Sequence, residues 1–534
     1  MTSSAMTSSD SPAPVVVIGC GPVGQTTALL LARWGLPVVV LDGRPARDLV
    51  GSKAICQQRD VLDVWDSVGV GAEIARRGVT WTTARTFHRD AELFSFEFVD
   101  RGQSPFPPFV NVSQCLTEEL LDSAIDAQPL IEVRWGHEVT GIEQDDAGVS
   151  VSCADGTTVA GSYAAACAGP RADVVRTALG LTFEGQTFGD QFLICDIRTD
   201  LPGWETERRF YFHPEWNPGR QVLIHPCPDS TFRIDWQVPP EFDLAAEEAS
   251  GGLDRRIRQV IGERPYEVVW KSVYRFHSRV VDRMRVGRVL VAGDAAHLVS
   301  PFGARGLNSG VLDAENAAWK LAFVLRGWAP ETLLDSYHDE RHAAAVENLD
   351  VTGATMRFLV PGTPAEAAHR LEVLERATTD PAARAEVDSG RLAEPFWYVD
   401  SPLTTPDERR PFPGRPARGD VPVPAPGVLA PDAPVTVPGR PDVVRLRQLA
   451  RAGVTVLVGD DAALPDALPG DLPVAVHRVS DLDAGSTLRE ALGVRPDETW
   501  VLRPDAHVAA VLTRPADVAP AVARLLARPV PAPV

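Results

Sequence analysis

The chain has 534 residues, too many for one ordinary hydrophobic core, so we expect two or three domains. Its 52 Lys and Arg residues against 72 Asp and Glu residues give a formal net charge of −20. Nucleic acids and anionic membranes both reward clustered cationic groups, so this balance argues against either as a partner. The charge is best explained as a contribution to solubility.

The cysteines and the chain start bear on location. Seven scattered cysteines without a CxxC or zinc-like pair indicate reduced intracellular thiols, and no metal site is predicted. Residues 1–14 lack the basic and apolar segments of a signal peptide and are interpreted as a disordered tail. The apolar runs are far shorter than the roughly 20 residues of a membrane helix. We therefore expect a cytoplasmic protein.

The segment Val15–Asp42 predicts a strand, a glycine turn, a helix and a second strand that ends in an acid. Gly19 permits the tight turn, Gly21 lets a pyrophosphate approach the backbone, and Gly24 lets helix and strand pack closely. Unpaired N–H groups and the dipole at the helix N-terminus favour the anion. Asp42 stands where a carboxylate can accept hydrogen bonds from an adenosine ribose.

Covering elements are expected after this unit. Arg59–Val68 and Leu116–Ile125 have helical character, and the second has a start signal at Thr117 with acids in its first turn. Val139–Cys153 alternates around a turn at Asp145–Gly148, which predicts a hairpin. We expect both helices to cover the nucleotide-binding sheet.

From about Phe183 the pattern changes to strands with aromatic residues, which predicts an inserted antiparallel sheet. The expected strands are Arg208–His213, Gln221–His225 and Thr231–Val238. In the last of them Arg233, Asp235 and Gln237 share one face, because side chains alternate along a strand. One face is expected to roof a substrate pocket between domains.

A second nucleotide-site segment begins at Arg288. The apolar strand Val289–Ala292 is followed by Asp294, at the edge of the sheet where ligands of open α/β folds bind, so this carboxylate can reach a polyol. Pro301–Gly306 is a loop poor in side chains, and Leu307–Leu325 has the spacing of a helix whose N-terminus would face a second anion or an electron-rich ring. Together the two segments predict FAD, because an NAD-dependent dehydrogenase has no obvious use for the second.

The remainder of the chain has a different composition. Leu321–Ala393 is expected to be mostly helical, and Glu394–Pro438 is a proline-rich connector. The last part has predicted strands at Val454–Val458, Val474–Val479 and Trp500–Leu502, and helices at Val444–Ala452 and Pro520–Ala527.

With the glycine turn and the Gly-Asp-Ala-Ala-His run at Gly293–His297, the chain resembles the flavoprotein aromatic hydroxylases typified by para-hydroxybenzoate hydroxylase and phenol hydroxylase. The resemblance runs from about Val15 to the end and is closest to the branch of hydroxyphenylpropionate and aromatic polyketide hydroxylases. It implies FAD as cofactor, NADPH or NADH as co-substrate, and O2. The implied reaction is hydroxylation of a phenolic or other electron-rich ring through a flavin C4a-hydroperoxide, in aromatic catabolism or natural-product tailoring.

The resemblance also implies the fold and its domains. It predicts an α/β fold with a Rossmann-like FAD domain, an inserted antiparallel-sheet substrate domain and a thioredoxin-like C-terminal domain without CxxC. The ending Val501–Ala510 carries that last likeness, and without cysteines the domain is expected to serve packing or dimerisation. The predicted boundaries are a tail at 1–14, FAD domain at 15–182 and 286–393, sheet at 183–285, connector at 394–438 and C-terminal domain at 439–534.

The resemblance assigns cofactor contacts. Asp294 binds the ribityl chain, Pro301 lies beside the flavin ring, and backbone N–H groups of Gly306, Leu307 and Asn308 face its pyrimidine edge, where they would stabilise negative charge. Gln114 matches a glutamine close to the flavin, although a role at a helix start stays open. The complete predicted cofactor set is Gly19, Gly21, Pro22, Gly24, Asp42, Arg44, Lys53, Gln114, Val139, Asp294, Pro301, Gly303, Gly306, Leu307 and Asn308.

Two residues depart from the family pattern. Lys53 stands where relatives have an arginine near the FAD phosphates, so the charge is kept and the bidentate fork is lost. Ala168 replaces the aspartate of an Asp-Gly motif that is linked to flavin and pyridine-nucleotide handling, while Arg171 and Arg176 remain.

A general base would activate a phenol by removing its proton. The candidates are Tyr211, His213, His225 and Asp235 on the inserted sheet; His225 is preferred, and His225, Tyr211 and Asp235 form the predicted catalytic set. A structural role stays open for each, and for His297 it is the favoured interpretation. Baeyer–Villiger oxygenation, epoxidation or a catalytically silent FAD-binding protein remain alternatives, and a homodimer is compatible with the sequence. Halogenation is disfavoured, because its Trp-x-Trp-x-Ile-Pro signature is matched only loosely at Trp236.

Overall fold

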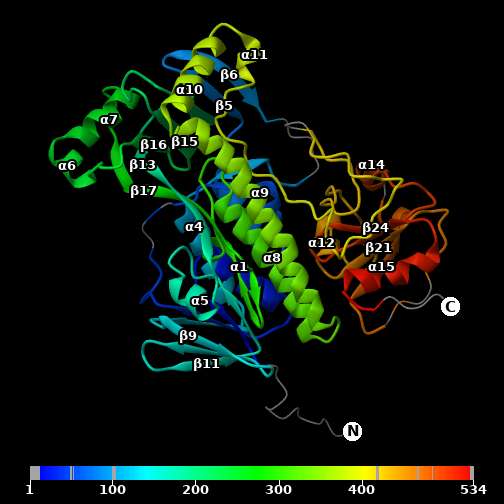
Figure 1. The fold of residues 1–534 in the computed structure, drawn as a ribbon. Coiled ribbons are helices and arrows are strands. Elements are labelled where there is room, and N and C mark those ends of the chain that lie inside the picture. The colour runs from blue at the N-terminus through cyan, green and yellow to red at the C-terminus, as the bar shows by residue number, and fades with distance from the viewer. Residues whose placement is uncertain are drawn as a thin grey trace.

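The computed structural model describes residues 13–48, 51, 53–98, 104–416, 420–465, 468, 470–483 and 485–529. The predicted tail at residues 1–14 lies outside this range except for its last two residues. Figure 1 shows a central body, an upper sheet with flanking helices, and a C-terminal body, orange to red, beside α8 (Gly306–Leu325). No helix in the described part of the chain is both long enough and apolar enough to cross a membrane.

The central body is built on a six-stranded sheet with the order β18-β19-β12-β1-β2-β8, parallel except at the edge strand β18. Its strands are β1 (Val15–Ile18), β2 (Val38–Asp42), β8 (Ile131–Trp135), β12 (Tyr163–Ala166), β18 (Arg285–Val286) and β19 (Val289–Val291). All four residues of β1 are buried, as expected for a parallel strand covered on both faces. The helix α1 (Pro22–Arg33) packs between α4 (Gln114–Asp126) and α8.

Smaller elements complete this body. The predicted hairpin is confirmed as β9 (Val139–Gln144) and β10 (Val149–Cys153), which pair with a third strand. A second small sheet has the order β3-β7-β4. The remaining elements are β3 (Cys56–Gln58), α2 (Arg59–Asp66), α3 (Gly71–Arg77), β4 (Val79–Thr80), β7 (Phe109–Asn111), β11 (Thr158–Gly161) and α5 (Asp173–Ala178).

The inserted sheet has eight strands in the order β20-β17-β13-β16-β15-β14-β5-β6. They are β5 (Thr83–His88), β6 (Ala91–Glu97), β13 (Phe183–Arg198), β14 (Glu207–Phe212), β15 (Gln221–Cys227), β16 (Thr231–Val238), β17 (Glu267–Val281) and β20 (His297–Leu298). The predicted boundaries 183–285 therefore leave out three of its strands. Periodicity along the chain does not report such pairing, since β5 joins β14 from more than a hundred residues away.

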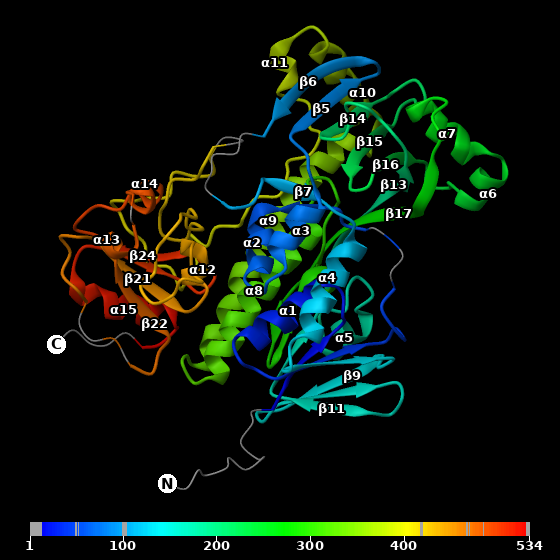
Figure 2. The ribbon, with the colours of Figure 1, turned by 180° about the vertical axis from the view of Figure 1, so that it is seen from behind.

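The two faces of this sheet have different neighbours. We call inner the face with Phe192, Phe210 and Leu223, which packs on Phe302 and on Leu359 of α9. The outer face packs on α6 and α7. Figure 2 shows these helices at the far edge of the sheet. The flanking helices are α6 (Leu244–Ala249), α7 (Gly252–Ile261), α9 (Asp335–Leu359), α10 (Pro364–Ala377) and α11 (Pro381–Arg384).

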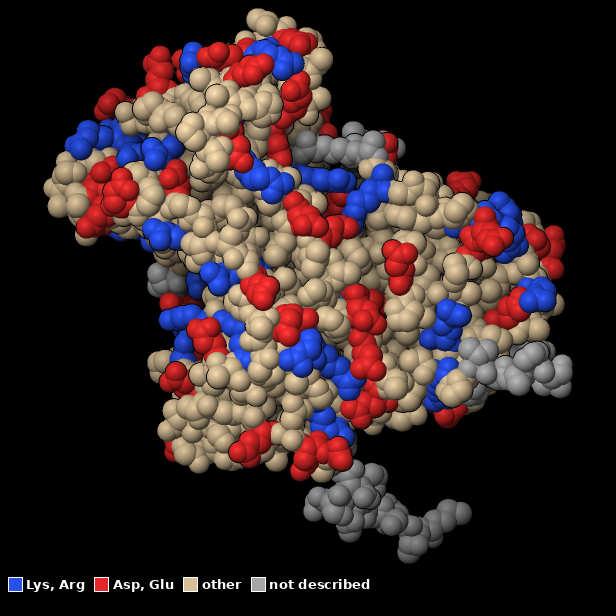
Figure 3. Space-filling view, in the orientation of Figure 1, with Lys and Arg blue, Asp and Glu red and all other residues tan. Residues whose placement is uncertain are grey.

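The C-terminal body contains a four-stranded sheet with the order β22-β21-β23-β24. β21 is parallel to β22 and antiparallel to β23, and β23 is antiparallel to β24. Its elements are α12 (Leu446–Ala450), β21 (Val454–Val458), β22 (Val474–Arg478), α13 (Val479–Leu482), α14 (Thr487–Leu492), β23 (Thr499–Leu502), β24 (Val508–Leu512) and α15 (Val518–Leu525). The second half of the predicted connector, from Ala425 to Val437, contributes buried side chains to this core. Charges of both signs are interspersed on the face drawn in Figure 3.

Candidate flavin and substrate site

The glycine turn between β1 and α1 leaves an open cradle at the helix N-terminus. Gly19 has a φ of +98°, and a Cβ there would lie 2.9 Å from the Cα of Ala168. A Cβ at Gly24 would lie 1.9 Å from the Gly19 carbonyl oxygen, whereas a Cβ at Gly21 would meet nothing within 4 Å. Pro22 begins the helix, where its missing N–H costs nothing. The turn therefore exposes helix N–H groups to an incoming diphosphate.

Asp42 at the end of β2 is held by the turn and by the residue that follows. Its Oδ2 accepts a hydrogen bond from the Cys20 backbone N–H at 2.8 Å, and its Oδ1 accepts from the backbone N–H and from Nε of Arg44, each at 2.9 Å. Burial alone would raise the pKa of Asp42, but these hydrogen bonds hold it below its usual value. The Arg44 guanidinium lies 5.5 Å from the centre of the Trp135 ring. Val139, another member of the predicted cofactor set, is half-buried at the start of β9.

Asp294 lies just beyond β19, as predicted. Its carboxylate makes no hydrogen bond within the described residues, and burial raises its pKa. His297 and Lys53 both oppose this rise in the pKa of Asp294. The exposed side chain of Lys53 is therefore near the carboxylate of Asp294. A half-buried carboxylate without a partner among the described residues is suited to accept hydrogen bonds from the hydroxyl groups of a polyol.

A buried network fixes the turn that carries Asp294. Oδ2 of Asp313 accepts hydrogen bonds from the Gly293 backbone N–H at 2.9 Å and from Nε2 of His297 at 2.7 Å. Oδ1 of Asp313 accepts from Nε of Arg341 at 2.7 Å. Burial favours the neutral acid, but these cations hold the pKa of Asp313 at about 2. His297 is thus placed in a structural network rather than in the substrate space.

The N-terminus of α8 is open in the same manner as that of α1. A Cβ at Gly306 would meet nothing within 4 Å, and the backbone N–H groups of Gly306, Leu307 and Asn308 belong to the first turn, where a helix provides no acceptor for them. The Asn308 side chain is used internally: its Oδ1 accepts from the Gln58 backbone N–H at 3.1 Å, and its Nδ2 donates to the Cys56 carbonyl oxygen at 2.9 Å. Asn308 therefore ties β3 to the flavin end of α8.

The remaining predicted cofactor residues border this space. Pro301 is exposed at the start of the loop, and Gly303 has a φ of +102°. Gln114 begins α4; its Oε1 accepts from the Ala54 backbone N–H at 3.0 Å and its Nε2 donates to Oε1 of Glu118 at 2.8 Å. Gln114 is thus both a helix-start residue and a support for the loop that carries Lys53. Two open helix ends and a half-buried carboxylate without a partner among the described residues fit the diphosphate, the ring edge and the ribityl chain of FAD.

His225 and Asp235 lie together on the inner face of the sheet. Leu223 is the direct cross-strand partner of Asp235, so His225 is its diagonal neighbour, with Nε2 3.8 Å from Oδ2 of Asp235. Burial raises the pKa of Asp235 to about 7, and one of its oxygens, Oδ1, has no partner within the described residues. Burial and the charges of Arg208 and Arg233 lower the pKa of His225 well below its usual value. Near neutral pH the imidazole is therefore uncharged and the carboxyl titrates.

Residues 12–352 match the family described as FAD binding domain, which is more than half of the chain. The chain belongs to this family. The rifampicin monooxygenase of Streptomyces venezuelae is 32% identical over 374 residues, 67% of this chain and 74% of that protein. The para-nitrophenol 4-monooxygenase of Pseudomonas sp. strain WBC-3 is 29% identical over 380 residues, 69% of this chain and 92% of that protein. The chain is an FAD-dependent aromatic monooxygenase.

Solved structures show the same fold over nearly the whole chain. The flavin-dependent monooxygenase PieE, solved with FAD and substrate, has a TM-score of 0.82 at 23% identity, covering 97% of this chain and 100% of that one. Aklavinone-11 hydroxylase, solved with FAD and aklavinone, has a TM-score of 0.75 at 24% identity with the same coverage. These likenesses establish the fold of this FAD-family member.

Two predicted base candidates lie apart from the His225–Asp235 pair in this monooxygenase. Tyr211 pairs with Val222 and packs with the outer-face cluster, and its ring stacks on Phe87 at 4.6 Å. The side chain of Tyr211 is therefore on the opposite side of the sheet from His225, because neighbouring residues of a strand alternate. His213 lies beyond the end of β14 with a φ of +49°, and burial together with nearby cations lowers its pKa to about 4.

Two further residues, Arg208 and Gln221, lie on the inner face according to the strand register, although no sequence motif marks them. Arg208 is buried, and its charge acts on both members of the pair. Gln221 is cross-strand partner of Phe212 and has no exposed surface. The signal that could have found them is the alternation of side chains along a strand, which already grouped Arg233, Asp235 and Gln237. Along β14 the same alternation puts Arg208 on the face of Phe210. Along β15 it puts Gln221 on the face of His225.

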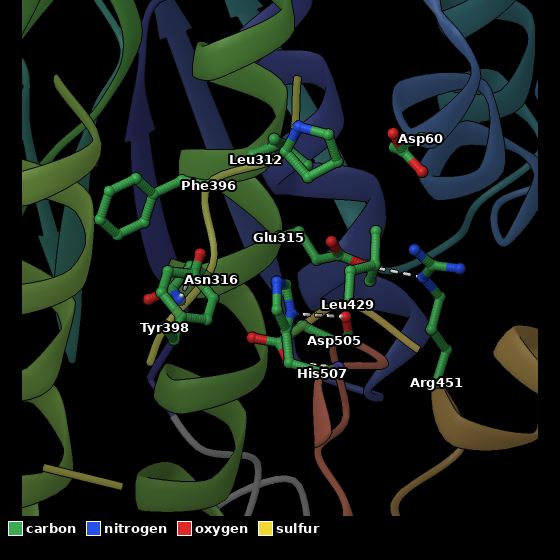
Figure 4. A pocket seen from close by; sticks show the side chains of 11 residues that line it. Asp60, Leu312, Glu315, Asn316, Phe396, Tyr398, Leu429, Arg451, Asp505 and His507 are labelled. Carbon is green, nitrogen blue, oxygen red and sulfur yellow. Dashed lines mark hydrogen bonds and ion pairs between the residues drawn. The ribbon is translucent and has the colours of Figure 1, made fainter. Parts of the chain in front are cut away.

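The cavity in Figure 4 lies elsewhere, between α8 and the C-terminal body. Glu315 and Asn316 of α8 line one side, and Arg451 and His507 line the other. Nε of Arg451 donates to Oε1 of Glu315 at 2.7 Å, and its Nη1 donates to Oδ2 of Asp63 at 2.7 Å. This cavity belongs to the contact between the FAD domain and the C-terminal body, not to the flavin site.

Proposed function

We propose that this monooxygenase hydroxylates a phenolic or other electron-rich ring that lies between the flavin and the inner face of the eight-stranded sheet. The observation that carries the proposal is the pair of His225 and Asp235 on that face, each with less than one-fifth of its side chain exposed, and with one carboxylate oxygen that has no partner among the described residues. Asn308 of α8 donates a hydrogen bond to the Cys56 carbonyl oxygen. The charge of Arg208 opposes the rise in the pKa of the Cys56 thiol that burial causes, and the same charge acts on His225 and Asp235. The pair of His225 and Asp235 is therefore close to the N-terminal end of α8, where we expect the flavin.

The cofactor and the two residues of the pair have different roles in the proposed reaction. Bound FAD supplies the redox chemistry, taking a hydride from NADPH or NADH and activating O2 for transfer of one oxygen atom. Asp235 takes the proton of the substrate hydroxyl, since its pKa of about 7 makes it the stronger base of the pair at neutral pH. The uncharged His225 beside it orients the carboxyl group. The sequence favoured His225 as the base, and the electrostatics of the buried site shift that role to Asp235.

The aromatic character of the inner face supports the same proposal. Phe192 stacks on Phe276 at 4.6 Å, and Phe302, next to Pro301 in the flavin loop, lies edge-on to Phe192 at 5.5 Å. Such side chains offer a flat ring an apolar surface and exclude water, which suppresses wasteful loss of activated oxygen. The named activities of the relatives on rifampicin, para-nitrophenol and aklavinone are consistent with an aromatic substrate.

The domain assignment is part of the proposal. The strand order and directions of the C-terminal sheet, with α12 before β21 and α15 after β24, support a thioredoxin-like domain without a dithiol. We propose that it holds α8 in place through Arg451, in a cytoplasmic enzyme that acts as a monomer or homodimer. Ala168 lies against Gly19 and has no carboxylate, so residues other than Ala168 would have to bind NADPH or NADH.

A coupled assay tests the function. The FAD-loaded enzyme should oxidise NADPH or NADH slowly alone and faster when a phenol is added, with a hydroxylated product detected by mass spectrometry. Faster oxidation that yields only hydrogen peroxide, for every phenol offered, would refute hydroxylation. The absence of any flavin reduction would instead indicate a silent FAD-binding protein.

A further inference from the structure

Two glutamines stand side by side on the inner face and differ in how their amides are used. Nε2 of Gln237 donates to Oδ2 of Asp190 at 2.7 Å, and its Oε1 accepts from the Gln221 backbone N–H at 3.2 Å. Both amide atoms of Gln221, in contrast, are buried without a hydrogen-bond partner among the described residues. The Gln221 side chain has no exposed surface.

An unpartnered buried amide is costly. A buried donor or acceptor without a partner destabilises the fold, which favours a group from a ligand or a water molecule as the partner that completes it. The neighbours of Gln221 on the inner face are Phe212 across one strand pair, Leu223 along its own strand, and Gln237, whose amide is already bonded to Asp190 and to the Gln221 backbone N–H. A polar group on an otherwise apolar ligand would satisfy the amide.

The position of Gln221 relative to the base sets the geometry of that ligand. Leu223 is directly opposite Asp235, and Gln221 is two residues along the same strand, so Gln221 and Asp235 are diagonal neighbours. Diagonal neighbours on one face are roughly 7–8 Å apart. Phe210 and Phe212 flank this line on the next strand and provide an apolar surface beside it.

We propose that Gln221 is a specificity-determining residue that recognises a second oxygen function of the substrate, a hydroxyl or carbonyl group distant from the hydroxyl that faces Asp235. The inference rests on the proposed function, since it takes the Asp235 side as the reacting end. Two fused rings, or one ring with a short polar side chain, bridge this spacing. Bare phenol offers Gln221 no partner.

The test compares two probes that differ by one distal oxygen. 2-Naphthol and 2,6-dihydroxynaphthalene are titrated into the FAD-loaded enzyme without NADPH, and binding is followed by the change in flavin absorbance. The wild type should bind the diol about tenfold more tightly, the equivalent of one satisfied buried hydrogen bond. Gln221→Leu should abolish that preference while still binding 2-naphthol.

The matched control is Gln191→Leu. Gln191 is on β13 of the same sheet, but its neighbour Phe192 faces inward, so Gln191 points outward, where its Nε2 donates to the Pro240 carbonyl oxygen. This variant should keep the preference for the diol. Because Gln221→Leu removes unpartnered polar atoms from a buried site, it should also melt at or above the wild-type temperature in the absence of ligand.

The outcomes separate the inference from the function on which it rests. An equal preference for the diol in wild type and Gln221→Leu, or no binding of either naphthol to the wild type, overturns the role of Gln221 and leaves a water molecule as its partner. If a panel of single-ring phenols is hydroxylated as well as the diol, the function stands and the inference fails. If the diol binds with the expected preference and no phenol is hydroxylated, the recognition stands and the proposed reaction fails.

Discussion

Nε2 of His225 lies 3.8 Å from Oδ2 of Asp235 on the inner face of the sheet, where both side chains are largely but not fully buried. Two titratable groups in such an environment do not both carry charge at low cost. Burial discourages the anion of Asp235 and the cation of His225 alike, so the site holds an uncharged imidazole beside a carboxyl that loses its proton near pH 7.

Replacement of Asp235 tests its role as base. Asp235→Asn keeps the size and hydrogen-bonding capacity but removes the proton acceptor, so we expect kcat to fall about 100-fold. The wild-type rate should rise with pH through about 7, where Asp235 ionises, and the variant profile should lose that inflection. Flavin absorbance should stay unchanged. A variant that keeps the inflection would assign the base elsewhere.

The same carboxyl predicts a stability effect with a definite sign. The folded-state pKa of Asp235 is raised from 3.8 to about 7, so the folded protein binds more protons than the unfolded chain in this window. Stability contributed by Asp235 is therefore lost as pH rises from about 4 to about 7. The advantage of Asp235→Asn over the wild type in melting temperature should therefore grow from about pH 4 to about pH 7 and level off above that. A constant difference across this window would contradict the raised pKa.

The open cradle at α1 predicts a loss of cofactor without a loss of fold. Gly21 has a φ of −83°, which other residues adopt, and a Cβ there meets no atom of the protein. Gly21→Val should therefore fold but place methyl groups in the diphosphate space, weakening the Kd for FAD more than tenfold, about 1.4 kcal/mol or more. Fluorescence titration of the apoprotein measures it. Gly470→Val, also with free space around its Cβ, is the control and should bind FAD normally.

Asp294 should show opposite effects on fold and cofactor. Its carboxylate is half-buried and has no partner in the described part of the chain, and burial raises its pKa. Asp294→Asn removes the half-buried charge, so the apoprotein should melt at or above the wild-type temperature at neutral pH. The amide is a weaker acceptor for ribityl hydroxyls, so FAD should dissociate faster. Unchanged FAD affinity would exclude a contact with the ribityl chain.

The ion pairs of Arg451 with Asp63 and Glu315 should contribute to the free energy of unfolding, because they join the C-terminal body to the FAD domain. All three side chains are at least nine-tenths buried. Arg451→Ala leaves two buried carboxylates without this partner and should cost about 3–5 kcal/mol in urea unfolding. Arg440→Ala is the control, because Arg440 and Asp442 form an exposed ion pair, which water and salt screen, so its loss should leave the unfolding free energy nearly unchanged. Equal losses in both variants would mean that the interface is not held by these buried ions.

Local sequence patterns predicted those elements whose structure depends on residues close together in the chain. The strand, turn and helix from Val15 to Arg33, the helix after Pro301 and the strands of the inserted sheet from Arg208 to Val238 were found where periodicity and glycines indicate them. The strand β24 was missed because its run of small apolar residues, Val508–Leu512, does not alternate.

Relations between distant segments could not be predicted in the same way. The pairing of β5 with β14 and the packing of Ala425–Val437 into the C-terminal core depend on tertiary contacts. The site shows the same limit: Tyr211 and His225 looked equivalent by composition, and only the strand register separates their faces. Burial, which sets the pKa of Asp235, is likewise a property of the folded molecule.

Isotope labelling tests the central claim of aromatic hydroxylation most directly. The FAD-loaded enzyme is supplied with NADPH or NADH, ¹⁸O2 and a panel of phenol, 2-naphthol and 2,6-dihydroxynaphthalene, and products are weighed by mass spectrometry. We predict a ring-hydroxylated product that carries one ¹⁸O atom from O2, formed faster from the diol than from phenol. Consumption of NADPH or NADH with no labelled aromatic product from any member of the panel would contradict the account.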